Sequence, residues 1–329
     1  KVTRISNSNQ NFNIYQIASD YLKNNRMIFV VLPTLFDAQK YYDSLINLLD
    51  EDNVLFYPVD DMGLASLFIS SNEFKYERIN TIISLLDNKP KVVVTTANGA
   101  MYKNLNKKVW KESVIKFNVG DTYKISDIRN ILIKFGYVCK SSVTSTGEFS
   151  VRGSIIDIYS YSSELPLRID FFGDEIDSIR SFDVTDQLSK DRYDRISIIP
   201  QLSQNNTKHQ SFTTFFPDDS IIMMRNKDFL LDRVGQIYDE GFANQVFEER
   251  LANATEVERY NIEEQLRKEL HLITRSSLSC ELERFKIVEY SQQQPQNDKY
   301  DTIIKFNFVS QPPFHKNFEL LTDTLQQYS

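Results

Sequence analysis

Residues suited to recognising another molecule alternate along one short segment. Within Leu167–Phe172, the side chains of Arg168, Asp170 and Phe172 fall on one face of an extended chain, and three apolar side chains fall on the other. An arginine donates a rigid fork of hydrogen bonds, and a phenylalanine buries a large area at low entropic cost. Such pairs are typical of the dominant contacts in protein–protein interfaces.

Two further residues extend this candidate surface. Arg152, followed by Gly153, precedes the first predicted strand of the region and could join the same face, and Asp170 is well placed to orient Arg168. The alternative is that Phe172 is half-buried under a neighbouring element and that the arginines are solvated. Residue types alone favour this alternative, because single exposed apolar residues are ordinary on protein surfaces.

Side chains that could support catalysis or metal binding lack the necessary spacing. The histidines have no neighbour at metal-ligand spacing: His209, His271 and His315. Turns and pairing with arginine explain the acidic residues of the region more simply than acid–base catalysis or a cation site does: Asp157, Asp170, Asp174, Glu175 and Asp177. Asp60-Asp61 resembles the carboxylates of a nucleotide site but does not directly follow a buried strand. We predict no catalytic residue and no metal site.

The elements that position the candidate surface are predicted to form a small antiparallel sheet. Ser154–Tyr159 is a run of β-branched and aromatic residues, and Leu167–Phe172 alternates strictly. Gly173-Asp174 turns the chain, and Glu175–Phe182 returns. A helix capped by Ser126 and ended by Gly136 leads into this sheet.

Residues 1–108 are predicted to be an α/β unit. Apolar strands are indicated at Met27–Leu32, Asn53–Tyr57 and Lys91–Thr96. Helices are indicated at Asn13–Asn24, from a cap at Thr34 to about Leu49, and at Glu73–Leu86. Strands and helices that alternate in this way predict a parallel sheet with right-handed crossovers.

The remaining chain divides into two parts. Residues 109–203 form the predicted second domain, and residues 204–329 are expected to complete the first. The elements expected in the last part are strands at Ser211–Phe216, Ser220–Met224, Phe285–Tyr290 and Thr302–Ser310, a helical region at Lys227–His271 and a helix at Asn317–Tyr328.

Composition and charge argue against several classes of function. The 329 residues carry a net charge of −7, which argues against a strong non-specific grip on nucleic acid. Two cysteines far apart, no signal-peptide pattern and no apolar run of membrane-spanning length predict a cytoplasmic protein without membrane contact. Because the chain begins at Lys1 rather than at methionine, we expect it to be part of a longer protein.

A longer motif contains the candidate surface: GEFSVRGSIIDIYSYSSELPLRIDFFGDEIDSIRSFD, residues 147–183. It resembles the second domain of the bacterial transcription-repair coupling factor family, which is similar to domain 2 of the excision-repair protein UvrB. The resemblance implies that this domain docks UvrA, and that the residues responsible are Arg152, Arg168 and Phe172, supported by Asp170 and Gly153. It therefore raises the protein-binding interpretation above the alternative.

The resemblance extends more weakly over the whole chain and specifies the fold class. It implies a degenerate RecA-like, P-loop NTPase-like domain with a parallel sheet, into which an α+β domain similar to UvrB domain 2 is inserted. The stretch that corresponds to the Walker A loop, Ile5–Tyr15 (ISNSNQNFNIY), has neither glycine nor lysine and should not hold a triphosphate. The segment that would correspond to the DNA-inserting hairpin of UvrB, Pro58–Phe74, has no tyrosine.

These features imply a non-catalytic module without a cofactor, which recruits UvrA to RNA polymerase stalled at DNA damage. ATP and Mg²⁺, and contacts with RNA polymerase and double-stranded DNA, are implied only for other parts of the parent protein, an ATP-dependent translocase. Another part of that protein could cover the UvrA-binding surface. The alternatives are a UvrB-type damage-loading ATPase or helicase fragment, and a nucleic-acid-binding module.

Overall fold

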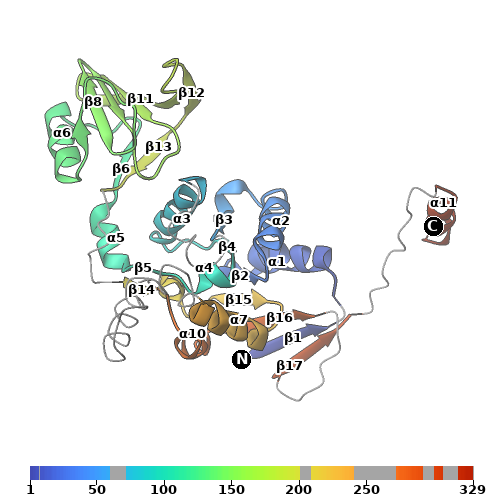
Figure 1. Ribbon diagram of the computed structural model, residues 1–329. Coiled ribbons are helices and arrows are strands. Elements are labelled where there is room, and N and C mark those ends of the chain that lie inside the picture. Colours follow the sequence, from blue (N-terminus) through green and yellow to red (C-terminus); the bar gives the residue numbers. More distant parts are fainter. Residues whose placement is uncertain are drawn as a thin grey trace, which may run out of the picture.

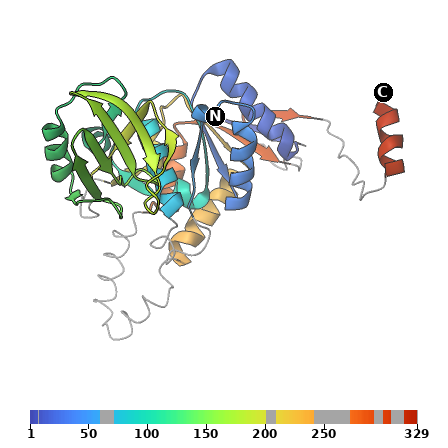
Figure 2. The same cartoon turned by 90° about the horizontal axis from the view of Figure 1, so that it is seen from above.

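The computed structural model describes residues 1–6, 8–59, 72–200, 209–240, 272–291, 300–306 and 318–328 (Figure 1). These residues build an α/β unit and a β-rich unit, which lie side by side in Figures 1 and 2. The last described element, helix α11 (Phe318–Tyr328), follows residues outside the described ranges.

A seven-stranded parallel sheet organises the α/β unit. Its strands, in their spatial order, are β17 (Thr302–Lys305), β1 (Val2–Ser6), β16 (Lys286–Ser291), β15 (Ile221–Met224), β2 (Ile28–Leu32), β4 (Val92–Thr96) and β3 (Val54–Tyr57). Every neighbouring pair in this sheet is parallel. The predicted mixed α/β class with a parallel sheet is therefore confirmed.

Helices cover both faces of this sheet, because its central strands are apolar on both sides. In β2, Ile28, Val30 and Leu32 pack in one core cluster, and Phe29 and Val31 pack in the other. Helices α1 (Gln10–Asn24) and α2 (Leu35–Ile46) contribute to the first cluster. The helices α3 (Asn72–Leu85), α4 (Ala97–Ala100), α7 (Lys227–Glu240) and α10 (Arg275–Leu282) cover the opposite face. The predicted cap of α2 is confirmed, since Thr34 Oγ1 accepts a hydrogen bond of 3.1 Å from the Asp37 amide.

A buried ion pair fixes strand β1 to the sheet. The Arg4 guanidinium lies 2.7 Å from a carboxylate oxygen of Glu289 on β16, and both side chains are buried. The other oxygen of Glu289 accepts a hydrogen bond from the amide of Lys227 at the start of α7, and Tyr300 also donates to this carboxylate. Strands from the two ends of the chain are thus joined by a network whose charges are paired and hydrogen-bonded.

The β-rich unit is inserted between strands β4 and β15 of the parallel sheet. Two antiparallel pairs connect it to the α/β unit: β5 (Lys103–Leu105) with β14 (His209–Ser211), and β6 (Ile115–Asn118) with β13 (Arg195–Ile198). Helix α5 (Lys107–Ser113) lies between β5 and β6. Entry and exit of the inserted chain are therefore adjacent.

The inserted unit is built on a six-stranded sheet. In spatial order its strands are β12 (Ser189–Arg192), β11 (Glu175–Phe182), β10 (Leu167–Phe172), β9 (Ile155–Ile158), β8 (Glu148–Arg152) and β7 (Val138–Cys139). All pairs are antiparallel except β7 with β8. Helix α6 (Ile125–Lys134) packs Ile128 and Leu132 against one face of the sheet. The opposite face carries mainly polar side chains, together with Phe172 and with Phe182, whose ring packs under Arg168.

Several local predictions need correction. Phe212–Phe215 is a 3₁₀ turn, so only the second of the two strands expected after residue 210 exists, as β15. The N-cap of α6 is Lys124 and not Ser126, whose hydroxyl contacts Asp127 instead. The predicted C-terminal stop of α6 is confirmed, since Gly136 has φ +85°. Most of the proposed helical region after Lys227 and most of Pro58–Phe74 lie outside the described residues.

Two glycines with the same backbone conformation allow a test of packing in the inserted unit. Gly147 and Gly120 both have φ +88°, but a Cβ on Gly147 would lie 2.3 Å from the Tyr161 hydroxyl, whereas one on Gly120 would meet nothing within 4 Å. We expect Gly120→Ala to lower the free energy of unfolding by about 1 kcal/mol through backbone strain alone. Gly147→Ala should cost about 1–3 kcal/mol more because of overpacking.

Urea unfolding followed by circular dichroism would measure both glycine variants. Equal losses of stability would contradict the close approach of Tyr161 to Gly147.

Candidate protein-interaction surface

The exposed face of the six-stranded sheet brings the predicted site residues together. Leu167, Ile169 and Phe171 of β10 are buried against the core, as predicted, while the alternate residues face outward. Phe172 is 84% exposed, so the alternative in which a neighbouring element half-buries it is wrong. Arg168 and Phe172 lie about 13 Å apart along the strand, which fits within one ordinary protein–protein contact area.

A single buried carboxylate holds both arginines. Asp157 on β9 has only 2% of its side chain exposed and lies directly opposite Arg168 in the register of β9 and β10. Its two oxygens lie 2.7 Å and 3.0 Å from Nε and Nη2 of Arg168. The Arg152 Nη2 donates to the same carboxylate. Asp157 therefore fixes the spacing of the two cations.

Further contacts leave Arg168 little freedom. Its Nη2 also donates to Gln187 Oε1 at 3.0 Å, and its guanidinium carbon lies 4.3 Å from the centroid of the buried Phe182 ring. The hydrogen bonds to Asp157 raise the pKa of Arg168 above its ordinary value, although burial acts in the opposite direction. Arg168 is thus a preorganised cation at the protein surface, a condition that lowers the entropic cost of binding a partner.

Arg152 is more exposed than Arg168 and lies at a turn. It is the last residue of β8, a strand that the sequence analysis missed, and its side chain is 49% exposed, compared with 12% for Arg168. Gly153 and Ser154 form the two-residue turn to β9, and Gly153 has φ +60° with open space around it. Glycine is favoured here because the turn needs a positive φ.

Asp157, rather than the predicted Asp170, is the hydrogen-bonding partner of Arg168, and Asp170 acts on Arg168 through its charge. Asp170 pairs with Arg180 of β11 at 2.9 Å and accepts a hydrogen bond from Ser178, whereas Asp157 orients Arg168. The reason is strand register, since Asp170 lies opposite Ser178, and Arg168 lies opposite both Asp157 and Arg180. Asp170 is still on the outward face, as part of a second ion pair.

A β-bulge brings Arg180 onto this face. Asp170 pairs with Ser178 and Phe171 pairs with Ile176, which leaves Asp177 as the extra residue of β11. As a result, Ile176 and Ile179 are both buried although they are three positions apart. An uninterrupted hairpin would place Ile179 opposite Arg168. The spacing of three between the two isoleucines therefore indicates a bulge, from which the outward position of Arg180 could have been predicted.

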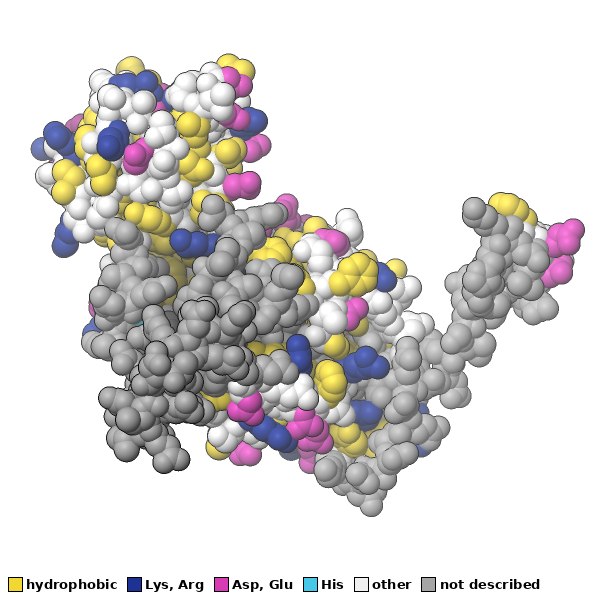
Figure 3. Space-filling view, in the orientation of Figure 1, with side chains coloured by type: hydrophobic (Ala, Val, Ile, Leu, Met, Phe, Trp, Pro, Cys, Tyr) yellow, Lys and Arg dark blue, Asp and Glu magenta, His cyan; other side chains and the backbone are white. Residues whose placement is uncertain are grey.

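The described residues give less support to a nucleic-acid-binding surface, a metal site or a membrane-spanning helix. On the face seen in Figure 3, lysine and arginine side chains are scattered among acidic ones. Within the described ranges, no group of three or more histidine, cysteine, aspartate or glutamate residues could hold a metal ion. In the same residues, no helix is long and apolar enough to cross a membrane.

Comparison with known proteins places this surface in a defined class of domain. Residues 115–203, which include all of β6 to β13, match the family model described as the UvrB interaction domain. The match contains the six-stranded sheet and each of the residues predicted to bind a partner.

Two similar curated proteins have the same name. The chain is 36% identical over 176 residues to the transcription-repair-coupling factor of Bacillus subtilis (strain 168), a match that covers 54% of this chain and 15% of that protein. It is 34% identical over 182 residues to the transcription-repair-coupling factor of Staphylococcus haemolyticus (strain JCSC1435), covering 55% of this chain and 16% of that protein. The predicted resemblance to the UvrB-like region of transcription-repair coupling factors is therefore confirmed, and the match spans about one-sixth of their length.

Proposed function

We propose that this chain is a docking module of a transcription-repair coupling factor and that the outward face of its six-stranded sheet binds UvrA. The observation that carries the proposal is Phe172, an 84% exposed aromatic ring on the same strand face as an arginine fixed by a buried aspartate. An exposed phenylalanine ring contributes little to the stability of the fold and is available for contact with a partner protein.

The proposed contact uses three residues in different ways. Phe172 enters an apolar pocket of UvrA. Arg168, which is already held in place, donates from the edge of its guanidinium that remains exposed, and the more exposed Arg152 pairs with an acidic group at the rim. Binding of the described chain to purified UvrA, measured by calorimetry, tests the proposal. A folded chain that gives no binding would contradict it.

The proposal includes the relation to a longer protein. In a transcription-repair coupling factor this module would recruit UvrA to RNA polymerase stalled at damaged DNA. Other parts of the parent protein would hold ATP and Mg²⁺, contact RNA polymerase and double-stranded DNA, and move along the DNA. One of them would cover the UvrA-binding surface until it is needed, and the whole would act in the cytoplasm.

We also propose that the α/β unit is a RecA-like domain that has lost its nucleotide site. The stretch that we assign to the former phosphate-binding loop leads into helix α1, whose N-terminus is capped by its own chain, since Asn9 Oδ1 accepts a hydrogen bond of 2.8 Å from the Phe12 amide. Residues 5–15 contain no glycine for close backbone approach and no lysine for the phosphates. This part of the chain is therefore non-catalytic.

A nucleotide-binding measurement distinguishes the proposed non-catalytic module from the alternative, a UvrB-type ATPase. We expect no binding heat when ATP and Mg²⁺ are titrated into the chain at millimolar concentration, because neither a glycine nest nor a lysine is available. Fluorescent ATP analogues would provide a second readout. Saturable binding that unlabelled ATP displaces would favour the ATPase alternative.

A further inference from the structure

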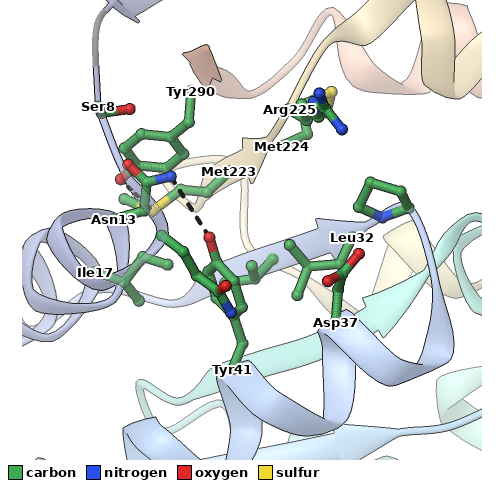
Figure 4. A pocket seen from close by; sticks show the side chains of 13 residues that line it. Ser8, Asn13, Ile17, Leu32, Asp37, Tyr41, Met223, Met224, Arg225 and Tyr290 are labelled. Carbon is green, nitrogen blue, oxygen red and sulfur yellow. Dashed lines mark hydrogen bonds between the residues drawn. The ribbon is translucent and has the colours of Figure 1, made fainter. Parts of the chain in front are cut away.

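The α/β unit contains a cavity at a position where open α/β sheets commonly bind ligands. It lies at the carboxyl ends of the adjacent parallel strands β2 and β15 (Figure 4). The helix after β2, α2, packs on one face of the sheet, and the helix after β15, α7, packs on the other. Ligand sites form at such switch points because the two chains separate there.

Three buried polar atoms in the lining have no hydrogen-bond partner among the described residues. They are Ser8 Oγ, Gln10 Nε2 and Asn13 Oδ1. Ser8 and Asn13 are only 4% and 8% exposed, and Figure 4 shows both at the same side of the cavity. Buried polar groups are nearly always paired, so these atoms indicate a missing partner. That partner must both donate, to Asn13 Oδ1, and accept, from Gln10 Nε2.

Opposite charges lie at the other side of the cavity. Asp37 from the first turn of α2 and Arg225 after β15 both line it, and both are drawn away from Ser8 and Asn13 in Figure 4. Asp37 accepts a hydrogen bond of 2.9 Å from the Thr34 hydroxyl, and the Arg225 side chain is exposed. A ligand with both an ammonium and a carboxylate group would complement this pair.

The lining between the two polar ends is largely apolar, with the Tyr41 hydroxyl, which accepts a hydrogen bond from the Asn13 amide nitrogen, as a polar group. The cavity's apolar lining includes Ile17, Val30, Leu32 and Met223. Its volume of about 180 Å³ is slightly larger than the roughly 150 Å³ cavity that holds benzene. A space of this size suits a molecule of about ten non-hydrogen atoms with a short aliphatic centre.

We propose that this cavity binds a free α-amino acid with a carboxamide side chain, of which L-glutamine is the best match. Its ammonium group contacts Asp37, its carboxylate contacts Arg225, and its methylene groups lie against Leu32 and Met223. The amide nitrogen donates to Asn13 Oδ1, and the amide oxygen accepts from Gln10 and Ser8. This site is independent of the proposed UvrA-binding surface, which belongs to the inserted unit.

Calorimetric titration of the 329-residue chain with L-glutamine, L-asparagine, L-glutamate and L-leucine tests the proposal. We expect millimolar or tighter binding of a carboxamide amino acid and at least about tenfold weaker binding of leucine, which cannot satisfy the three polar atoms. No binding of any of the four would overturn the proposal, and equal binding of leucine would overturn recognition of the carboxamide.

Two variants locate the ligand. Asn13→Leu removes the inner acceptor, and Arg225→Gln removes an exposed cation whose loss should leave the fold intact. Each should weaken glutamine binding by about tenfold or more. Because Arg225 is exposed, its variant remains informative even if Asn13→Leu fails to fold. Undiminished binding by folded Arg225→Gln would show that the amino acid binds elsewhere.

Discussion

Replacing Phe172 with alanine is expected to remove most of the affinity for UvrA and to leave the protein as stable as before. The ring is 84% exposed and lies outside the three core clusters of the described residues, so its loss should change the free energy of unfolding by less than about 0.5 kcal/mol. A central aromatic contact typically contributes about 2 kcal/mol or more to binding, which corresponds to roughly 30-fold weaker affinity.

A matched control is available in the other unit. Phe36 on α2 is also highly exposed, at 76%, but it lies in the α/β unit. We expect Phe36→Ala to bind UvrA like the unchanged chain in the same titration. If Phe36→Ala weakened binding as much as Phe172→Ala, the interface would not be confined to the β-sheet surface.

The second large effect, a loss of both stability and UvrA affinity, is expected when Asp157 is replaced, although Asp157 does not contact UvrA in the proposed complex. Asp157→Asn keeps the shape of the side chain but leaves Arg168, with 12% of its side chain exposed, without its anion. Removing one member of a buried ion pair typically destabilises a protein by about 3 kcal/mol. The same change should weaken UvrA binding, because Arg168 and Arg152 lose the group that fixes their positions. Urea unfolding and calorimetry would measure the two effects.

A double-mutant cycle separates positioning from general destabilisation. If Asp157 acts through Arg168, the losses of UvrA affinity in Asp157→Asn and Arg168→Ala will not add in the double variant. Asp170→Asn serves as the control, since Asp170 pairs with Arg180 and should affect binding less than Asp157→Asn. Fully additive losses, measured on folded variants, would contradict the positioning role of Asp157.

The candidate surface was predictable to the extent that it depends on alternation within one strand. The period of two in Leu167–Phe172 placed Arg168 and Phe172 correctly, because one face of the strand is entirely apolar. The partner of Arg168 was not predictable in this way, since it depends on the pairing of β9 with β10 and on a bulge in β11. Sequence neighbours suggested Asp170, whereas cross-strand register selected Asp157.

In the parallel sheet, too, strands with a local sequence pattern were predicted, and a strand that depends on a distant partner was not. Strands β2 and β4 are continuous apolar runs and were identified from the sequence, because both of their faces are buried. Strand β1 was missed since its centre is Arg4, an unfavourable residue for a buried strand until it is paired with Glu289, which lies 285 residues away. Within the stretch from Ile5 to Tyr15, Ile5 and Ser6 end β1, and the residues from Gln10 onward belong to α1.

The most direct test of the account is a calorimetric titration of UvrA with the 329-residue chain, comparing the unchanged protein with Arg168→Ala. We predict saturable binding by the unchanged chain and a loss of at least about tenfold in affinity for the variant, with unaltered circular dichroism spectra. Equal affinities for two folded proteins would show that the Arg168 face of the sheet is not the docking surface.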